Sequence, residues 1–197
     1  MRLADRLRAA LARPLAEGAV LYRADLPELE DLPDARPAAV LVAITDRPEP
    51  GVILTQRHAG LRDHAGQVAL PGGKVDPGDA SVEAAALREA WEEVGLRAAD
   101  VELVGRIEPY RTGSGYLIHP VIGVVPPDLP LVRREAEVDA IFEVPLAMLF
   151  DPASWAMESA EFRGAVRHFR AMMWQEWRVW GATAAMLGNL GMRLGHV

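Results

Sequence analysis

The chain has 197 residues, half of them hydrophobic, and a formal net charge of −7. This length predicts one domain with a sizeable core, and the negative charge argues against a general nucleic-acid binder. The absence of cysteine excludes disulfides, thiolate zinc sites and a cysteine nucleophile. No apolar run approaches the roughly 18 residues of a membrane span, so we expect a cytoplasmic protein that binds neither nucleic acid nor a membrane.

Residues 1–35 are expected to form a short helix followed by a lead-in segment. Leu3, Leu7, Ala10 and Leu11 share one helical face. Several arginines lie among them, but no continuous apolar stretch does, which excludes a secretory signal. A transit peptide is an alternative interpretation of this segment.

Residues 36–197 are expected to form one mixed α+β domain in which strands outnumber helices. The predicted strands cover residues 38–45, 52–57, 67–70, 101–111, 116–125, 138–144, 166–173 and 177–180. The first two of these strands, and the last two, are predicted to form hairpins. Residues 152–164 are predicted to be irregular. A short helix is predicted from Pro145, and a terminal helix interrupted by glycines is predicted over residues 182–194.

The central helix has clear start and stop signals. Residues 71–74, Pro-Gly-Gly-Lys, are predicted to form a glycine turn before it. Asp79 or Ser81 can cap its first turn, and Gly95 stands where a left-handed stop is expected. Its core-facing row has members four residues apart: Val82, Ala86, Ala90 and Val94. We therefore expect a helix that starts near Asp79 or Ser81 and ends before Gly95.

Three acids share one face of this helix. Glu89, Glu92 and Glu93 have the spacing i, i+3 and i+4, and like charges at such spacing repel. A solvated acidic face is the plain interpretation of such a cluster. Together with the glycine turn and the capped helix, however, the cluster favours a site for a hard divalent cation completed by substrate phosphates. Arg88 is expected to orient one of the carboxylates.

The segment from Gly73 to Leu96 resembles the Nudix box, G-x5-E-x7-R-E-U-x-E-E-x-G-U, in which U is aliphatic. The matching residues are Gly73, Arg88, Glu89, Glu92, Glu93, Gly95 and Leu96. Asp79 replaces the first glutamate, one extra residue precedes Arg88, and Ala90 is a small occupant of a U position. The resemblance implies an α/β/α sandwich with a mixed sheet, and hydrolysis of a nucleoside diphosphate linked to another group.

A second motif lies upstream and is similar to that of the coenzyme A (CoA) pyrophosphatase branch, L-L-T-x-R-[SA]-x3-R-x3-G-x3-F-P-G-G. The matching positions are Ile53, Leu54, Thr55, Arg57, Arg62, Gly66, Pro71, Gly72 and Gly73. His58 replaces the Ser or Ala, and Leu70 replaces the Phe. The resemblance implies cleavage of CoA or a derivative into 3′-phosphoadenosine 5′-phosphate and 4′-phosphopantetheine.

The two motifs imply a set of functional residues. Glu89, Glu92 and Glu93 would hold Mg²⁺ or Mn²⁺, and Glu89 or Glu137 (or Glu135) would accept a proton. The residues expected to contact the small-molecule substrate are Arg57, Arg62, Leu70, Gly72, Gly73 and Lys74, because arginine suits phosphate oxygens and the glycine segment allows close approach of the backbone.

Other functions stay open at this point. The substrate could instead be ADP-ribose, a dinucleotide or a nucleoside triphosphate, since His58 and Leu70 depart from the CoA motif. A ligand-sensing domain of the same family, which binds but does not hydrolyse, is a third hypothesis. The aromatic residues of the C-terminal third could form core packing, a homodimer surface, or a wall for the adenine or pantetheine arm. They are Trp155, Phe162, Phe169, Trp174, Trp177 and Trp180.

Overall fold

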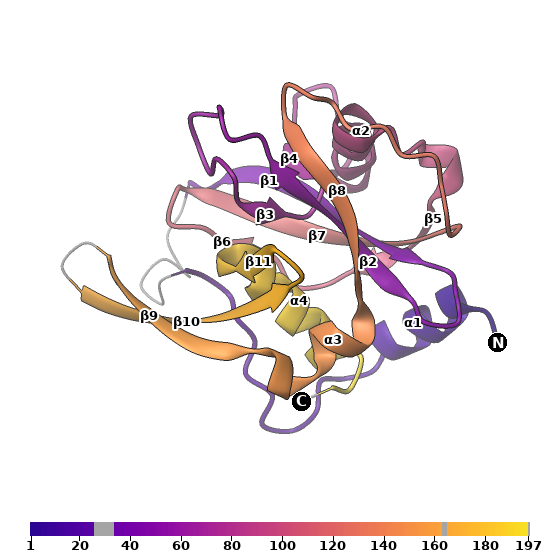
Figure 1. Cartoon of the computed structure of the whole chain (residues 1–197). Coiled ribbons are helices and arrows are strands. Elements are labelled where there is room, and N and C mark those ends of the chain that lie inside the picture. The colour runs from indigo at the N-terminus through magenta and orange to yellow at the C-terminus, as the bar shows by residue number, and fades with distance from the viewer. Residues whose placement is uncertain (26–33, 163–164, 197) are drawn as a thin grey trace.

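A mixed eight-stranded sheet forms the centre of the protein in the computed structural model, which describes residues 1–25, 34–162 and 165–196 (Figure 1). Its strands are β1 (Arg36–Thr45), β2 (Gly51–Arg57), β3 (Val68–Ala69), β4 (Gly72–Lys74), β5 (Glu102–Arg106), β6 (Tyr110–Arg111), β7 (Tyr116–Val125) and β8 (Val138–Pro145). The helices are α1 (Leu3–Leu11), α2 (Val82–Val94), α3 (Leu146–Phe150) and α4 (Gly181–Arg193), with short 3₁₀ turns η2 (Ala98–Asp100) and η3 (Pro152–Ser154).

β1 is the central strand and changes partner along its length. It runs parallel to β7 over its whole span, and the other pairings in this sheet are antiparallel. Its end pairs with β2 through Ile44 and Val52, whereas its start pairs with β4 through Ala38–Lys74 and Val40–Gly72. This change of partner brings β4 beside the start of β1, next to α2.

Helices cover both faces of this sheet. α2 lies on one face over a core that includes Leu41, Val94 and Val121, and α1, α3 and α4 pack on the other face around Ile44, Leu54 and Leu187 (Figure 1). The expected α/β/α arrangement with a mixed sheet is therefore confirmed. Among the described residues, no helix is long and apolar enough to cross a membrane.

A second, three-stranded sheet extends from the body of the molecule (Figure 1). It consists of β9 (Ala156–Phe162), β10 (Ala165–Trp174) and β11 (Trp177–Trp180). The predicted hairpin of the last two strands is confirmed. The prediction that residues 152–164 are irregular was wrong for β9, because its backbone pairs with β10 from Ala156–Ala171 outward. Apolar and polar residues alternate only weakly in this segment, so the sequence did not reveal its pairing with β10.

Aromatic residues of this region mostly pack inward. Trp155, Trp174 and Trp177 lie against the core, and Trp177 stacks on Phe142 with ring centroids 4.6 Å apart. The Phe169 and Trp180 rings instead lie beside the guanidinium of Arg178. The side chain of residue 162 lies outside the described part of the structure. Core packing thus accounts for three of the tryptophans.

Two further predictions of secondary structure need correction. The strand predicted over residues 101–111 is divided into β5 and β6, and its pairing with β7 shifts register between Leu103 and Gly105. Residues 72–74, predicted to form a turn, are strand β4, because β1 supplies hydrogen-bonding partners that glycine-rich sequence does not suggest. α4 also runs through its glycines, of which Gly191 lies against the ring of Phe150.

Candidate active site

α2 holds the acidic row in a fixed position. Ser81 caps the helix by accepting a hydrogen bond from the Ala84 N–H at 3.2 Å, and Gly95 ends it in the left-handed region with φ of 68°. Ala86, Ala90 and Val94 are completely buried against the sheet. The predicted limits and core face of this helix are confirmed, and its acidic row lies beside the buried one.

Glu93 is the buried member of the row. Its residue is only 5% exposed, its Oε2 accepts a hydrogen bond from the Gly72 N–H at 3.2 Å, and its Oε1 lies 3.9 Å from Arg57 Nη1. Burial raises the pKa of Glu93 to about 7, although Gly72 and Arg57 oppose this rise. Glu93 is therefore a carboxyl that would gain strongly from a nearby cation.

Glu89 faces the glycine strand. A Cβ atom on Gly73 would lie 2.5 Å from Glu89 Oε1, so only glycine leaves room for this carboxylate. Burial is the main cause of a raised Glu89 pKa, and a hydrogen bond from Arg88 opposes it. β4 thus contributes to the site twice, through the N–H of Gly72 and through the missing side chain of Gly73.

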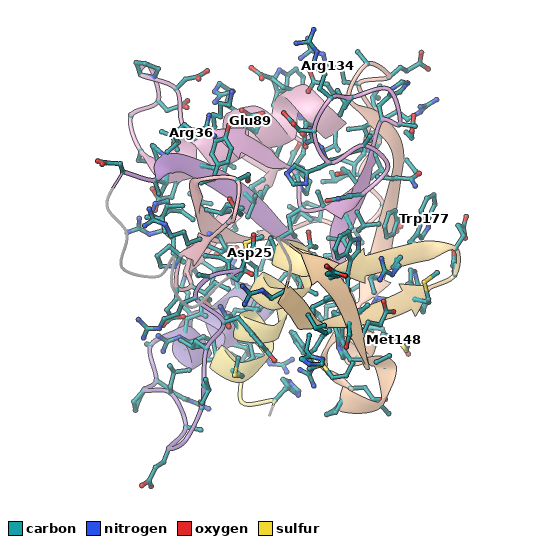
Figure 2. The ribbon with its side chains drawn as sticks, turned by 90° about the vertical axis from the view of Figure 1, so that its left-hand side faces the viewer. Asp25, Arg36, Glu89, Arg134, Met148 and Trp177 are labelled. Atoms are coloured by element: carbon teal, nitrogen blue, oxygen red, sulfur yellow. The ribbon has the colours of Figure 1, made fainter. Side chains whose placement is uncertain are left out.

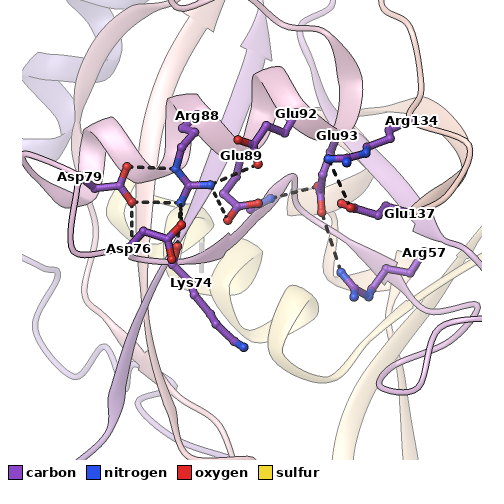
Figure 3. Close-up of polar contacts among 11 residues, drawn as sticks. Arg57, Lys74, Asp76, Asp79, Arg88, Glu89, Glu92, Glu93, Arg134 and Glu137 are labelled. Atoms are coloured by element: carbon purple, nitrogen blue, oxygen red, sulfur yellow. Dashed lines mark hydrogen bonds and ion pairs between the residues drawn. The ribbon is translucent and has the colours of Figure 1, made fainter.

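Arg88 connects the acids on this side of α2 (Figure 3). Its Nε and Nη2 donate to the two carboxylate oxygens of Asp79, each at 3.0 Å. Its Nη1 donates to Glu89 at 3.0 Å and to Glu92 at 3.2 Å, and its Nη2 also donates to the Lys74 carbonyl at 3.0 Å. Such a bidentate contact fixes the plane of the guanidinium, so Arg88 holds both Glu89 and Glu92, where the sequence predicted contact with one carboxylate.

Asp79 is the contribution that sequence reasoning undervalued. The sequence suggested it as a helix cap and as a departure from the Nudix pattern, yet its carboxylate holds Arg88 and also accepts a hydrogen bond from the Asp76 N–H at 2.8 Å. The bond from Arg88 is the main reason why the Asp79 pKa is lowered. The signal that could have found this role is the turn Asp76-Pro77-Gly78-Asp79, which returns the chain toward Arg88.

Glu137 comes to the site from the loop before β8. The Arg134 N–H donates to the Glu93 carbonyl at 2.9 Å, which attaches this loop to the end of α2. Glu137 pairs with Arg134 at 3.4 Å and points toward Glu93 (Figure 3). Its charge contributes to the raised pKa values of both Glu89 and Glu93. Glu137 is therefore close enough to the row to take part in its chemistry.

The other predicted site residues differ in where the structure places them. Arg57 approaches Glu93, and its Nε is buried without a partner. Arg62 is exposed in the loop of residues 58–66, and in the described part of the chain no hydrogen bond or ion pair joins its side chain to the acidic row. Leu70 is buried in the core on the α4 side of the sheet. The side chain of Lys74 is exposed and runs away from α2 (Figure 3).

The residues fit a divalent cation in their chemistry. Within the described residues, no three His, Asp or Glu side chains are gathered closely enough to form a ready-made metal site, because Arg88 engages Glu89 and Glu92. The donors are nevertheless carboxylate oxygens, which hard cations prefer. Gly73 leaves space beside the Glu89 carboxylate, and a cation there would stabilise the charged form of the buried Glu93. Glu89 and Glu93 are the first candidates to hold it, with Glu92 beside them.

Comparison with known proteins shows the family of this chain. The family model of the NUDIX domain matches residues 35–167. The uncharacterized Nudix hydrolase NudL of Escherichia coli (strain SMS-3-5 / SECEC) is 46% identical over 160 residues, which cover 81% of this chain and 83% of that protein. The protein of the same name from Shigella boydii serotype 4 has the same identity and coverage.

Among solved structures, a Nudix hydrolase from M. smegmatis, RenU, is 26% identical, with a TM-score of 0.49 over 58% of this chain and 73% of that one. The family match and the identity to NudL decide the assignment, and the capped acidic helix beside a glycine strand is its structural counterpart. The chain belongs to the Nudix hydrolase family, whose members hydrolyse pyrophosphate linkages and typically depend on divalent metal ions.

Proposed function

We propose that this protein is a metal-dependent diphosphatase that cleaves CoA or a CoA derivative. The observation that carries the proposal is the contact between its two motifs. Arg57 and Gly72, both from the upstream motif, approach the two oxygens of Glu93 in the Nudix helix. Residues of the upstream motif therefore lie beside the Nudix helix, which supports a shared site, and the pattern of this motif is the one that resembles CoA pyrophosphatases.

The cationic groups of the site suit an anionic substrate. Arg57 presents a guanidinium at the buried end of the acidic row, and its planar fork matches the oxygens of a phosphate. Binding of a phosphate there would also give the unpartnered Nε of Arg57 an acceptor. CoA carries a diphosphate and a separate 3′-phosphate, so it is strongly anionic and needs such contacts.

Hydrolysis adds water across the diphosphate. A divalent cation at Glu89 and Glu93 would supply charge that neutralises the two phosphates and favours ionisation of the attacking water. The water oxygen forms a bond to one phosphorus atom, the bridging P–O bond breaks, and the leaving phosphate keeps the bridging oxygen. The products are 3′-phosphoadenosine 5′-phosphate and 4′-phosphopantetheine, or its acylated form.

The protein's own groups hold and move the remaining charges. Arg88 keeps Glu89 and Glu92 on the cation side of α2. Glu137 accepts the proton of the water in this proposal, because it faces Glu93 and, unlike Glu89, is not engaged by Arg88. The Gly72 N–H and Arg57 limit the rise of the Glu93 pKa, so that Glu93 stays available as an anion.

A substrate panel tests the proposal. We expect CoA with Mg²⁺ or Mn²⁺ to yield 3′-phosphoadenosine 5′-phosphate, measured by chromatography, and chelation to abolish the reaction. ADP-ribose, a dinucleotide and a nucleoside triphosphate form the comparison set. A kcat/KM for CoA below those of the other substrates would reject the CoA assignment and retain another Nudix hydrolase. CoA binding without turnover under either metal would favour the ligand-sensing hypothesis.

A further inference from the structure

We propose that Arg36, Lys74 and Tyr116 form a subsite for a phosphomonoester of the substrate, separate from the diphosphate contacts beside α2. The inference rests on the proposed function and makes it more specific. The phosphomonoester would be the 3′-phosphate that distinguishes CoA from dephospho-CoA. A chain that prefers the phosphorylated form needs cationic groups at some distance from the cleaved bond.

The sheet brings these three side chains to one face. Arg36 pairs directly with Tyr116 in the parallel β1–β7 ladder, and Ala38 pairs with Lys74 in the antiparallel β1–β4 ladder. Because side chains alternate along a strand and paired residues share a face, Arg36, Tyr116 and Lys74 project from the same side of the sheet. This side is opposite to α2, as the direction of Lys74 also indicates (Figure 3).

Lys74 is the one lysine in the chain, which has 20 arginines besides. Its side chain is exposed, and among the described residues it has no ion-pair or hydrogen-bond partner. The nearest acid that follows it, Asp76, lies 3.6 Å from Arg88 Nη2 instead. The ammonium of Lys74 is therefore a free positive charge at the edge of β4.

Arg36 is held in a defined orientation. Its guanidinium carbon lies 4.1 Å from the centre of the Tyr116 ring, its Nη2 donates to the Ser114 carbonyl at 3.0 Å, and its backbone N–H donates to the Gly115 carbonyl at 3.0 Å. A stacked guanidinium still has N–H donors at its edge for a planar or tetrahedral anion. Figure 2 shows Arg36 at the end of the molecule that also carries Glu89.

The loop under Arg36 is fixed from the N-terminal segment. The carboxylate of Asp25 accepts a hydrogen bond from the Tyr110 hydroxyl at 2.7 Å and one from the Gly113 N–H at 2.5 Å. The hydroxyl of Thr112 accepts a bond from the Tyr116 N–H at 3.1 Å. These contacts order residues 112–116 before any ligand binds, and such preorganisation lowers the cost of recognition.

The subsite is directly connected to the acidic row. The Lys74 carbonyl accepts a hydrogen bond from Arg88, and the preceding residue, Gly73, is the one that faces Glu89. A ligand that crosses β4 would therefore place its diphosphate beside the acidic row on the α2 side. Its second anionic group would then lie beside the cationic side chains on the other side. A substrate with two separated anionic groups, such as a nucleoside 3′-phosphate 5′-diphosphate, matches this arrangement.

The test compares CoA with dephospho-CoA. In the unaltered protein we expect a higher kcat/KM for CoA, expressed mainly in KM. Lys74→Met and Arg36→Gln should each lower this preference about tenfold, the effect of one lost charged hydrogen bond, and Lys74→Arg should restore part of it. Arg97→Gln, which changes an exposed arginine paired with Asp100, is the control. If the preference for CoA over dephospho-CoA were the same in the unaltered protein and in all variants, the subsite would be rejected.

Direct binding separates this inference from the proposed function. If the unaltered protein hydrolyses neither compound, the proposed function fails, and calorimetry with adenosine 3′,5′-bisphosphate and adenosine 5′-monophosphate decides the subsite by itself. Tighter binding of the bisphosphate that Lys74→Met removes would support the subsite. Equal affinity for the two nucleotides would reject it.

Discussion

Asp79 precedes α2 and Glu93 lies in its last turn, and folding moves their pKa values in opposite directions. Asp79 receives a two-point contact from Arg88, which lowers its pKa. Glu93 is buried with one backbone N–H and a distant arginine, and its pKa rises to about 7. Acids with such different environments usually have different tasks. The comparison suggests that Asp79 builds the site, whereas Glu93 keeps an incompletely compensated charge for a cation and substrate.

Removing the charge of Glu93 should have the largest effect. Glu93→Gln preserves the shape of the side chain, but we expect kcat/KM to fall at least about 100-fold, the scale of a catalytic electrostatic group. The free energy of unfolding in urea should stay equal or rise, because a buried carboxyl is costly. Glu49→Gln, at an exposed loop position, is the control. A fully active Glu93→Gln enzyme would refute the assignment of the site.

Gly72 and Gly73 offer a second way to separate structure from activity. In Gly73→Ala, the new Cβ meets only the end of the flexible Glu89 side chain. The fold should survive, and displacement of the carboxylate should lower kcat about 10- to 100-fold. In Gly72→Ala, the new Cβ would meet backbone atoms of Ala39 and Val40 at 2.4 and 2.6 Å, so a loss of stability of about 1–3 kcal/mol is expected.

Thermal unfolding and steady-state hydrolysis, measured on both glycine variants, distinguish these outcomes. A stable, fully active Gly73→Ala protein would contradict the role given to the space at Glu89. An unchanged melting temperature for Gly72→Ala would show that β4 shifts more easily than its contacts indicate.

Local chemistry explains what the sequence could predict here. The Ser81 cap, the Gly95 stop and the core-facing alanines depend on neighbours within a few residues, so the helix and the shared face of its acids were predictable. The burial of Glu93 was not, because Gly72 reaches it through a strand that pairs with β1. Propensity disfavours glycine in strands, which is also why β4 was predicted as a turn.

Longer-range features needed the structure for the same reason. The approach of Glu137 depends on where the loop before β8 attaches to α2, and its role was expected only from the family resemblance. Leu70 was predicted to contact substrate from its motif position, but side-chain alternation places it in the core. Motif spacing therefore predicts which segments lie near α2, but it does not predict the direction of each side chain.

The two arginines of the upstream motif should differ in effect. Arg57 approaches Glu93 and has a buried, unpartnered Nε, so Arg57→Gln is expected to lower kcat/KM about tenfold. Arg62 is exposed, and no ion pair or hydrogen bond between it and the acidic row is found among the described residues, so Arg62→Gln should have a smaller effect. Parallel kinetics with one substrate check this order. A larger loss for Arg62→Gln would mean that the loop of residues 58–66 closes over the substrate.

Asp79→Asn removes the charge that holds Arg88 and tests the structural role of Asp79. It should have the smallest effect on rate, a few-fold loss of kcat, because Arg88 keeps its bonds to Glu89 and the Lys74 carbonyl.

At pH 7 the Asp79→Asn variant should be less stable by about 1 kcal/mol through loss of a charged hydrogen bond. The Asp79 pKa is lowered from 3.8, so this stabilisation is fully present above that value and disappears as the pH falls through the folded-state pKa. Urea unfolding at pH 7, 5 and 3 should therefore show a difference that shrinks only in acid, with Asp63→Asn, an exposed loop position, as the control. A difference that is the same at all three pH values would mean that Asp79 acts through its shape and its bond to the Asp76 N–H rather than through its charge on Arg88.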